Sequence, residues 1–128
     1  MKKLITLFLI LALLIALTAC KEEKMATYEQ ITAEQAKTIM ETENEYVIID
    51  ARTQQEFDEG HIEGAVLIPE YEIADRAEKE LPQKDALILV YCRSGRRSKI
   101  ASEILVMLGY TNVKEFGGII DWPYETVK

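Results

Sequence analysis

The sequence contains few of the residues that bind metals or form covalent cross-links. It has one histidine and two cysteines in 128 residues, and their spacing matches no zinc site. We therefore expect no metal ion, and no residue pattern implies a cofactor. The part that follows the N-terminal segment contains no internal repeat and no low-complexity stretch, which excludes repeat architectures.

Positive charge is also scarce. Fifteen basic residues stand against 22 acidic ones, for a formal charge of −7. A surface of this sign repels nucleic acid and anionic lipid, so we expect no nucleic-acid partner. Four of the basic residues nevertheless gather in one short stretch: Arg93, Arg96, Arg97 and Lys99.

No apolar run is long enough for a comfortable membrane-spanning helix. The longest, Leu4–Leu17, follows two lysines, as in a secretory signal, and residues 17–20 read Leu-Thr-Ala-Cys. This ending resembles the bacterial lipobox, in which the cysteine is lipidated and becomes the first mature residue. We predict a lipoprotein signal peptide over 1–19, then a lipidated Cys20 and a tether over 20–27. The protein would then be exported and held at a membrane of the bacterial cell envelope. An ordinary signal peptide or an anchor helix is the alternative.

Short apolar runs alternate with helical patterns through residues 28–128, the region that we interpret as one domain. Capping-box spacing marks helix starts at Thr32 and Thr53. The predicted strands cover 28–31, 46–50, 65–68, 87–91 and 112–116. The predicted helices cover 33–41, a short segment from Thr53 to Gly60, 71–81, 98–108 and a short segment at 119–122, which follows a turn at Gly117-Gly118. This alternation predicts an α/β fold whose parallel sheet is flanked by helices on both faces.

Cys92 directly follows the predicted strand 87–91. It therefore lies at the carboxyl edge of the sheet, where ligands bind in such folds. A helix starting near Ser98 would aim its free N–H groups and its dipole at the thiol, which favours the thiolate and can hold an anion. If Cys20 carries lipid, Cys92 is the one free thiol. We predict that Cys92 is a nucleophile in an anion-binding loop.

The rest of this loop supplies the candidate binding residues. They are Arg93, Ser94, Gly95, Arg96, Arg97 and Ser98. Glycine at position 95 permits a backbone angle that turns N–H groups inward. We expect Ser98 to cap the following helix. Arg97 either binds substrate or locks the loop to a carboxylate, and both roles stay open.

Four residues outside the loop are candidate structural supports. Asp50 and Arg52 follow a predicted strand, and we expect them to form an ion pair. His61 is expected to make structural hydrogen bonds, with activation of the thiol as the alternative. Trp122 is expected to pack in the core, or else to line the pocket.

These motifs together resemble a single rhodanese-type sulfurtransferase domain over about residues 28–125. The resemblance rests on the segments Ile49–Arg52, Glu56–Phe57, Gly60–Ala65, Ile68–Pro69, Tyr91–Ser98 and Gly117–Gly118, with Trp122. Leu67 departs from the family pattern, which commonly has asparagine there, and Arg96 occupies a variable position.

The resemblance implies a parallel sheet of about five strands and a double-displacement reaction. Cys92 would attack the outer sulfur of thiosulfate or a persulfide, become a persulfide itself, and pass that sulfur to a thiol or cyanide. The expected partners are therefore a small anionic sulfur donor and a thiol acceptor, which is a small molecule or a protein. We expect a monomer.

Two other functions remain as alternatives. A cysteine phosphatase needs an arginine six positions after its cysteine, and here that position is Ser98, with Arg97 one residue early. The other alternative is a non-catalytic module for redox sensing or sulfur relay, whose Cys92 is oxidised or pairs with a partner.

Overall fold

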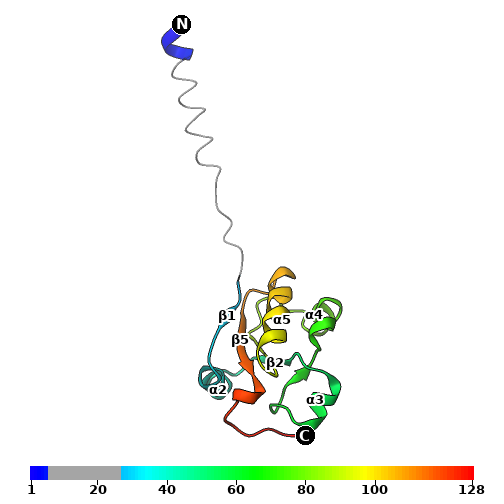
Figure 1. Cartoon of the computed structure of the whole chain (residues 1–128). Helices are drawn as coiled ribbons and strands as arrows, with labels where there is room; N and C mark the ends of the chain where they lie inside the picture. The colour runs from blue at the N-terminus through cyan, green and yellow to red at the C-terminus, as the bar shows by residue number, and fades with distance from the viewer. Residues whose placement is uncertain (6–26) are drawn as a thin grey trace.

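A parallel β-sheet with helices on both faces forms the core of the computed structural model, which describes residues 1–5 and 27–128 (Figure 1). The strands are β1 Glu29–Gln30, β2 Val47–Asp50, β3 Val66–Leu67, β4 Ile88–Cys92 and β5 Val113–Gly118. The helices are α2 Ala33–Thr42, α3 Gln54–Glu59, α4 Ile73–Glu80 and α5 Arg96–Met107, with two 3-10 helices, η1 Glu70–Glu72 and η2 Ile119–Asp121. The strand order is β1-β5-β4-β2-β3, with every pair parallel. The predicted fold class is confirmed.

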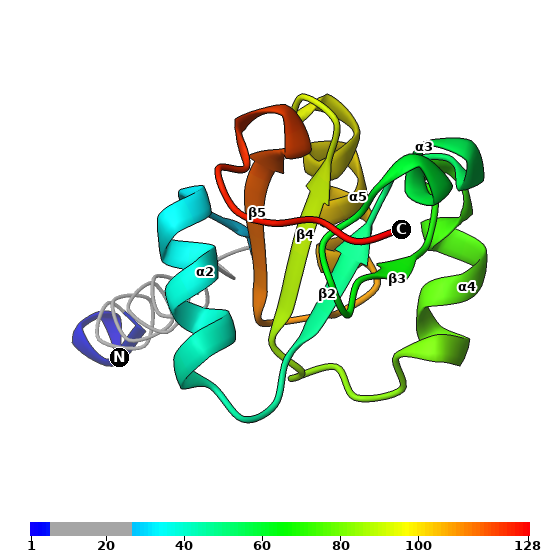
Figure 2. The same ribbon diagram turned by 90° about the horizontal axis from the view of Figure 1, so that it is seen from below.

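The alternating side chains of the central strands divide the core into two layers. Ile49 and Val90 face one side, where they pack with buried residues of α4 and α5. Ile48 and Leu89 face the other side, where α2 and the segment around Trp122 cover them. Figure 2 shows α2 separated by the sheet from α4 and α5. Burial on both faces explains the continuous apolar runs of these strands.

Two of the helices begin where the capping boxes predict. The Thr32 hydroxyl accepts a hydrogen bond from the Gln35 N–H, and the Thr53 hydroxyl accepts one from the Glu56 N–H. These bonds satisfy N–H groups that the first helical turn leaves free. The second cap fixes the start of α3 at Gln54, four residues after β2 ends at Asp50.

The structure corrects three predicted boundaries. Helix α5 begins at Arg96, two residues before Ser98, because Gly95 takes a left-handed φ of 101° and turns the chain into the helix early. The predicted turn at 117–118 belongs to β5, since Gly118 pairs with Cys92. The helix expected over 71–81 is divided between η1 and α4.

The predicted signal peptide falls mostly outside the described residues, and Cys20 falls wholly outside them. Within 1–5 and 27–128, no helix has the length and apolar character needed to cross a membrane.

Candidate active site

Cys92 ends β4 at the carboxyl edge of the sheet, as predicted, and its side chain is buried. Its sulfur accepts a hydrogen bond from the Gly95 N–H at 3.0 Å and lies 3.4 Å from the Ser98 hydroxyl. Burial raises the pKa of the thiol, but hydrogen bonds from Ser98, Gly95 and Ser94 outweigh it, so the pKa lies below its ordinary value. The site therefore favours the thiolate, the nucleophilic form.

The loop between Cys92 and α5 depends on two glycines. The left-handed backbone of Gly95 aims its N–H at the sulfur, as predicted. Gly118 at the end of β5 lies so close to the loop that an added Cβ would stand 2.0 Å from the Arg93 carbonyl oxygen. Only glycine fits at this contact between strand and loop.

Ser98 does not cap α5, so that prediction was wrong. No side chain caps this helix, and Ser98 is its third residue. Its buried hydroxyl instead lies between the Cys92 sulfur and the carboxylate of Glu115, 2.6 Å from Glu115 Oε1. Ser98 therefore links the cysteine to a buried acid of β5.

The structure assigns Arg97 to a carboxylate, one of its two predicted roles. Its guanidinium makes two 2.8 Å hydrogen bonds to Glu56 of α3. These bonds lower the pKa of Glu56 to about 2, against the opposing effect of burial and with help from Thr53. The pair fixes the start of α5 to α3 in a bidentate geometry.

Three loop side chains remain exposed beside the buried sulfur: Arg93, Ser94 and Arg96. The exposed Lys99 adds a further positive charge one turn into α5. The exposed Arg93 and Arg96 therefore concentrate positive charge on the loop that contains the sulfur. This arrangement can bind a small anion and present it to a sulfur nucleophile.

The predicted ion pair between Asp50 and Arg52 is present and buried. Arg52 Nη2 lies 2.7 Å from Asp50 Oδ2 and donates a second bond to the Gly60 carbonyl. The Tyr91 hydroxyl donates to the same Asp50 oxygen and accepts from the Ile62 N–H. This network joins the ends of β2 and β4 to the segment that follows α3.

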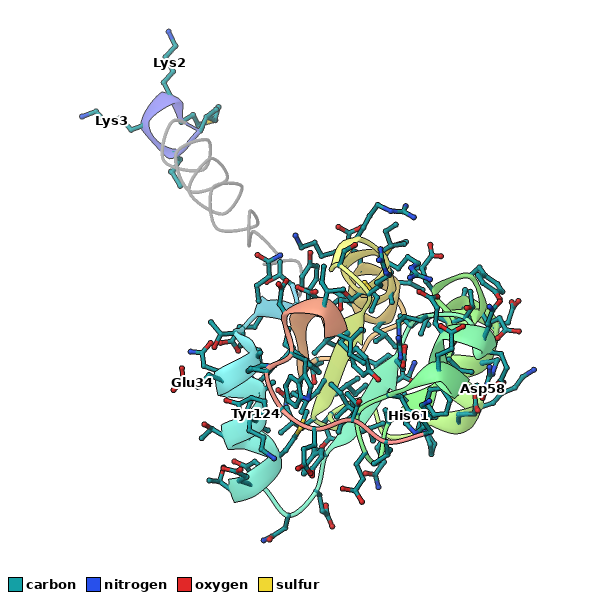
Figure 3. The ribbon with its side chains drawn as sticks, turned by 60° about the horizontal axis from the view of Figure 1, so that its bottom comes forward. Lys2, Lys3, Glu34, Asp58, His61 and Tyr124 are labelled. Carbon is teal, nitrogen blue, oxygen red and sulfur yellow. The ribbon has the colours of Figure 1, made fainter. Side chains whose placement is uncertain are left out.

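His61 and Trp122 have structural contacts. His61 stacks on Phe57 and hydrogen-bonds to its carbonyl, and it pairs through its backbone with Val127. Figure 3 shows His61 next to the C-terminal segment. Within the described part of the chain, none of its hydrogen bonds reaches Cys92. Trp122 packs against Phe116 in the core layer opposite Cys92. It lines a hollow beside α2, which does not include the cysteine.

The sequence reasoning missed Glu115 and left the partner of Arg97 unnamed. A signal for Glu115 was available, because a strand over 112–116 with Val113 inward places Glu115 on the same face. Both residues are buried in the structure. No sequence signal indicated that Glu56 pairs with Arg97, because its place in the capping box at Thr53 already accounted for a glutamate there.

The comparisons with known proteins agree with this geometry. A family model, described as Rhodanese-like domain, matches residues 32–123. Thiosulfate sulfurtransferase PspE of Escherichia coli is 39% identical over 80 residues, 62% of this chain and 77% of that protein. A sulfurtransferase of Allochromatium vinosum is 35% identical over 94 residues, 73% of this chain and 86% of that protein. The solved structure of a rhodanese with anions from E. coli is similar with a TM-score of 0.61 and 37% identity, over 65% of this chain and 98% of its own. The chain belongs to the rhodanese-like domain family, whose matching relatives here include sulfurtransferases.

Proposed function

We propose that this chain transfers sulfane sulfur through Cys92, from thiosulfate or a small persulfide to a thiol or cyanide. One observation carries the proposal: the Cys92 sulfur is held at the carboxyl edge of the sheet by the Gly95 N–H and Ser98, with its pKa lowered. The names of the relatives support the same reaction class.

The first half of the reaction uses the thiolate. It attacks the outer sulfur of the donor, the donor's S–S bond breaks, and sulfite or a thiolate leaves with the electron pair. The positive charges of the exposed Arg93 and Arg96 on this loop would attract the donor anion and balance the charge that the leaving group carries. Cys92 is left as a persulfide.

The second half regenerates the enzyme. An acceptor thiolate or cyanide attacks the outer sulfur of the persulfide, and Cys92 leaves as a thiolate. The Gly95 N–H that donates to the sulfur suits an anion in both halves. Because the loop stabilises the cysteine as a leaving group, one set of contacts serves both steps.

A phosphatase is supported less well. The position where its arginine would stand is the buried Ser98, and Arg97 is bonded to Glu56. The loop therefore lacks a free arginine at the position where a phosphatase binds the phosphate.

Mass measurement tests the proposal on the full chain carrying Cys20→Ser, in which Cys92 is the only thiol. We expect incubation with thiosulfate to add one sulfur atom, and cyanide to remove it. The matched variant with Cys92→Ser should gain none. Absence of an adduct with both thiosulfate and a small persulfide would overturn the proposal. Oxidation or mixed-disulfide formation without sulfur transfer would support the redox-sensing alternative.

We also propose, from residues 17–20 of the sequence, that Cys20 carries a lipid that holds the domain at a membrane of the cell envelope. Metabolic labelling with a fatty acid in a bacterial host should mark the wild-type chain and spare Cys20→Ala. Labelling that persists in this variant would contradict the anchor.

A further inference from the structure

A carboxylate lies buried directly behind the cysteine loop. Glu115 of β5 is 3% exposed, and its Oε1 accepts a hydrogen bond from the Gly117 N–H at 2.8 Å. No salt bridge reaches Glu115 among the residues that the structure describes. A buried carboxylate without a cation depends on hydrogen-bond donors, and the donors here are the Gly117 N–H and the Ser98 hydroxyl.

The Ser98 hydroxyl connects this carboxylate to the nucleophile. Its oxygen lies 2.6 Å from Glu115 Oε1 and 3.4 Å from the Cys92 sulfur. It also lies 3.0 Å from the Gly95 carbonyl oxygen and 3.4 Å from that of Gly117. A hydroxyl has one proton to donate, so it cannot satisfy a thiolate and a carboxylate at once. The contacts are satisfied when Cys92 and Glu115 hold one proton between them.

We propose that Cys92 and Glu115 share a single proton through the Ser98 hydroxyl, which makes Glu115 a positioning residue for the nucleophile. In one arrangement the thiol donates to Ser98, and Ser98 donates to the carboxylate. In the other, neutral Glu115 donates to Ser98, and Ser98 donates to the thiolate.

The two arrangements interconvert by moving two protons in the same direction. The S–H bond of Cys92 breaks as its proton binds Ser98 Oγ, and the original Ser98 proton passes to Glu115 Oε1. The pair keeps one negative charge throughout, and no proton is released to water. The thiolate can therefore form inside a buried site without a base from solvent.

One neighbouring positive charge favours the thiolate arrangement. Arg97 acts on the Cys92 side, where a cation stabilises the thiolate. Burial and the charge of Glu103 on α5 raise the pKa of Tyr28, which precedes β1. On the other strand face, Lys114 is paired with Glu29.

The pH dependence of alkylation by iodoacetamide tests the shared proton, again in the full chain with Cys20→Ser. Two coupled groups lose their protons in two macroscopic steps, so the rate should rise in two waves, with a plateau at about half the final rate for an evenly shared proton. Glu115→Gln removes one titrating group and should give a single wave. Glu59→Gln, a matched change at an exposed glutamate of α3, should keep both waves.

A second measurement needs no variant at position 115. With isotope-labelled glutamate, the NMR signal of the Glu115 carboxyl should titrate in the same two steps as the thiolate. Two waves that persist in Glu115→Gln, or a carboxyl that titrates independently of the thiol, would each overturn the proposal. The inference concerns the cysteine of the proposed function, but alkylation requires no sulfur donor. Failure of sulfur transfer would therefore leave the titration result standing, and the reverse also holds.

Discussion

At the scale of single residues, the reactivity of Cys92 depends on how its sulfur is hydrogen-bonded. Burial alone would raise the pKa of this thiol and leave it inert. The Gly95 N–H and the Ser98 hydroxyl reverse that effect because they favour the charged form. The buried position also excludes water from the sulfur, which strengthens each of these bonds.

Replacing Ser98 should therefore reduce the amount of thiolate. Ser98→Ala removes one hydrogen bond to a charged group, which corresponds to about a tenfold lower alkylation rate at neutral pH. Alkylation of Cys92 against pH measures the effect as a rise in the thiol pKa. Ser102→Ala is the matched control, since Ser102 is a buried serine of the same helix whose hydroxyl bonds to the Ser98 carbonyl. An unchanged profile in Ser98→Ala would contradict the role given to this hydroxyl.

At the scale of elements, the loop is held from two sides. At one side, Gly118 at the end of β5 packs closely against the loop. At the other side, Arg97 at the end of the loop is bonded to Glu56 of α3. The loop is therefore fixed by a strand and a helix as well as by its own sequence. Such support pre-organises the N–H groups before a donor binds.

A side chain at position 118 should displace the loop. In Gly118→Ala the new Cβ would overlap the Arg93 carbonyl, and we expect a loss of about 3 kcal/mol of unfolding free energy together with slower alkylation of Cys92. Urea unfolding and alkylation rates measure the two effects. Gly109→Ala separates steric overlap from backbone strain, because Gly109 has a φ of 98° but no atom within 4 Å of its added Cβ. It should cost about 1 kcal/mol and leave the cysteine unaffected.

The ion pair between Glu56 of α3 and Arg97 of α5 should make the stability of the domain depend on pH in the acid range. The pKa of Glu56 is about 2 in the folded protein, against 4.5 as its ordinary value. Between these pH values the unfolded chain therefore binds more protons than the folded protein. The contribution of Glu56 to the free energy of unfolding is fully present above pH 4.5 and falls as pH drops toward 2. In Glu56→Gln we expect this decline to be smaller by about 1 kcal/mol, as for a partly exposed bidentate pair.

Urea unfolding at a series of pH values measures this dependence. Glu59→Gln removes an exposed carboxylate from the same helix and should reproduce the wild-type curve. If Glu56→Gln also follows the wild-type curve, the ion pair between Glu56 and Arg97 contributes nothing to stability at acid pH.

At the scale of the whole molecule, one buried polar network ties the two central strands to the segment behind α3. Asp50 accepts bonds from Arg52 and from the Tyr91 hydroxyl, which in turn accepts the Ile62 N–H. Burial and the charge of Asp50 raise the pKa of Tyr91, so its hydroxyl stays a donor. The network fixes the carboxyl edge of the sheet, from which Cys92 projects.

Removing the Tyr91 hydroxyl should destabilise the whole domain. Tyr91→Phe leaves the Ile62 N–H and one bond of Asp50 unmade, at a cost of about 2 kcal/mol and a lower melting temperature by several degrees. Thermal unfolding followed by circular dichroism measures this loss. Tyr71→Phe changes an exposed tyrosine and should leave the melting temperature unchanged. Equal melting temperatures for both variants would contradict the structural role of the network.

The sequence by itself determined the features that depend on neighbouring residues. Capping boxes at Thr32 and Thr53, the buried strand before Cys92 and the helix after it follow from local backbone preferences, and these place the cysteine at the carboxyl edge of a parallel sheet. The motifs along residues 28–125 identified the family for the same reason, since each is a short local pattern.

Only the tertiary structure decided which distant side chains meet. Arg97 and Glu56 are 41 residues apart, and Ser98 and Glu115 are 17 apart, so their pairing depends on strand order and helix packing. Because of Gly95, α5 likewise begins two residues earlier than expected, at Arg96. Ser98 therefore lies inside the helix, where its hydroxyl bonds to Glu115 instead of capping the helix. Local pattern carries no information on such contacts, because they form only when separate elements come together around the sheet.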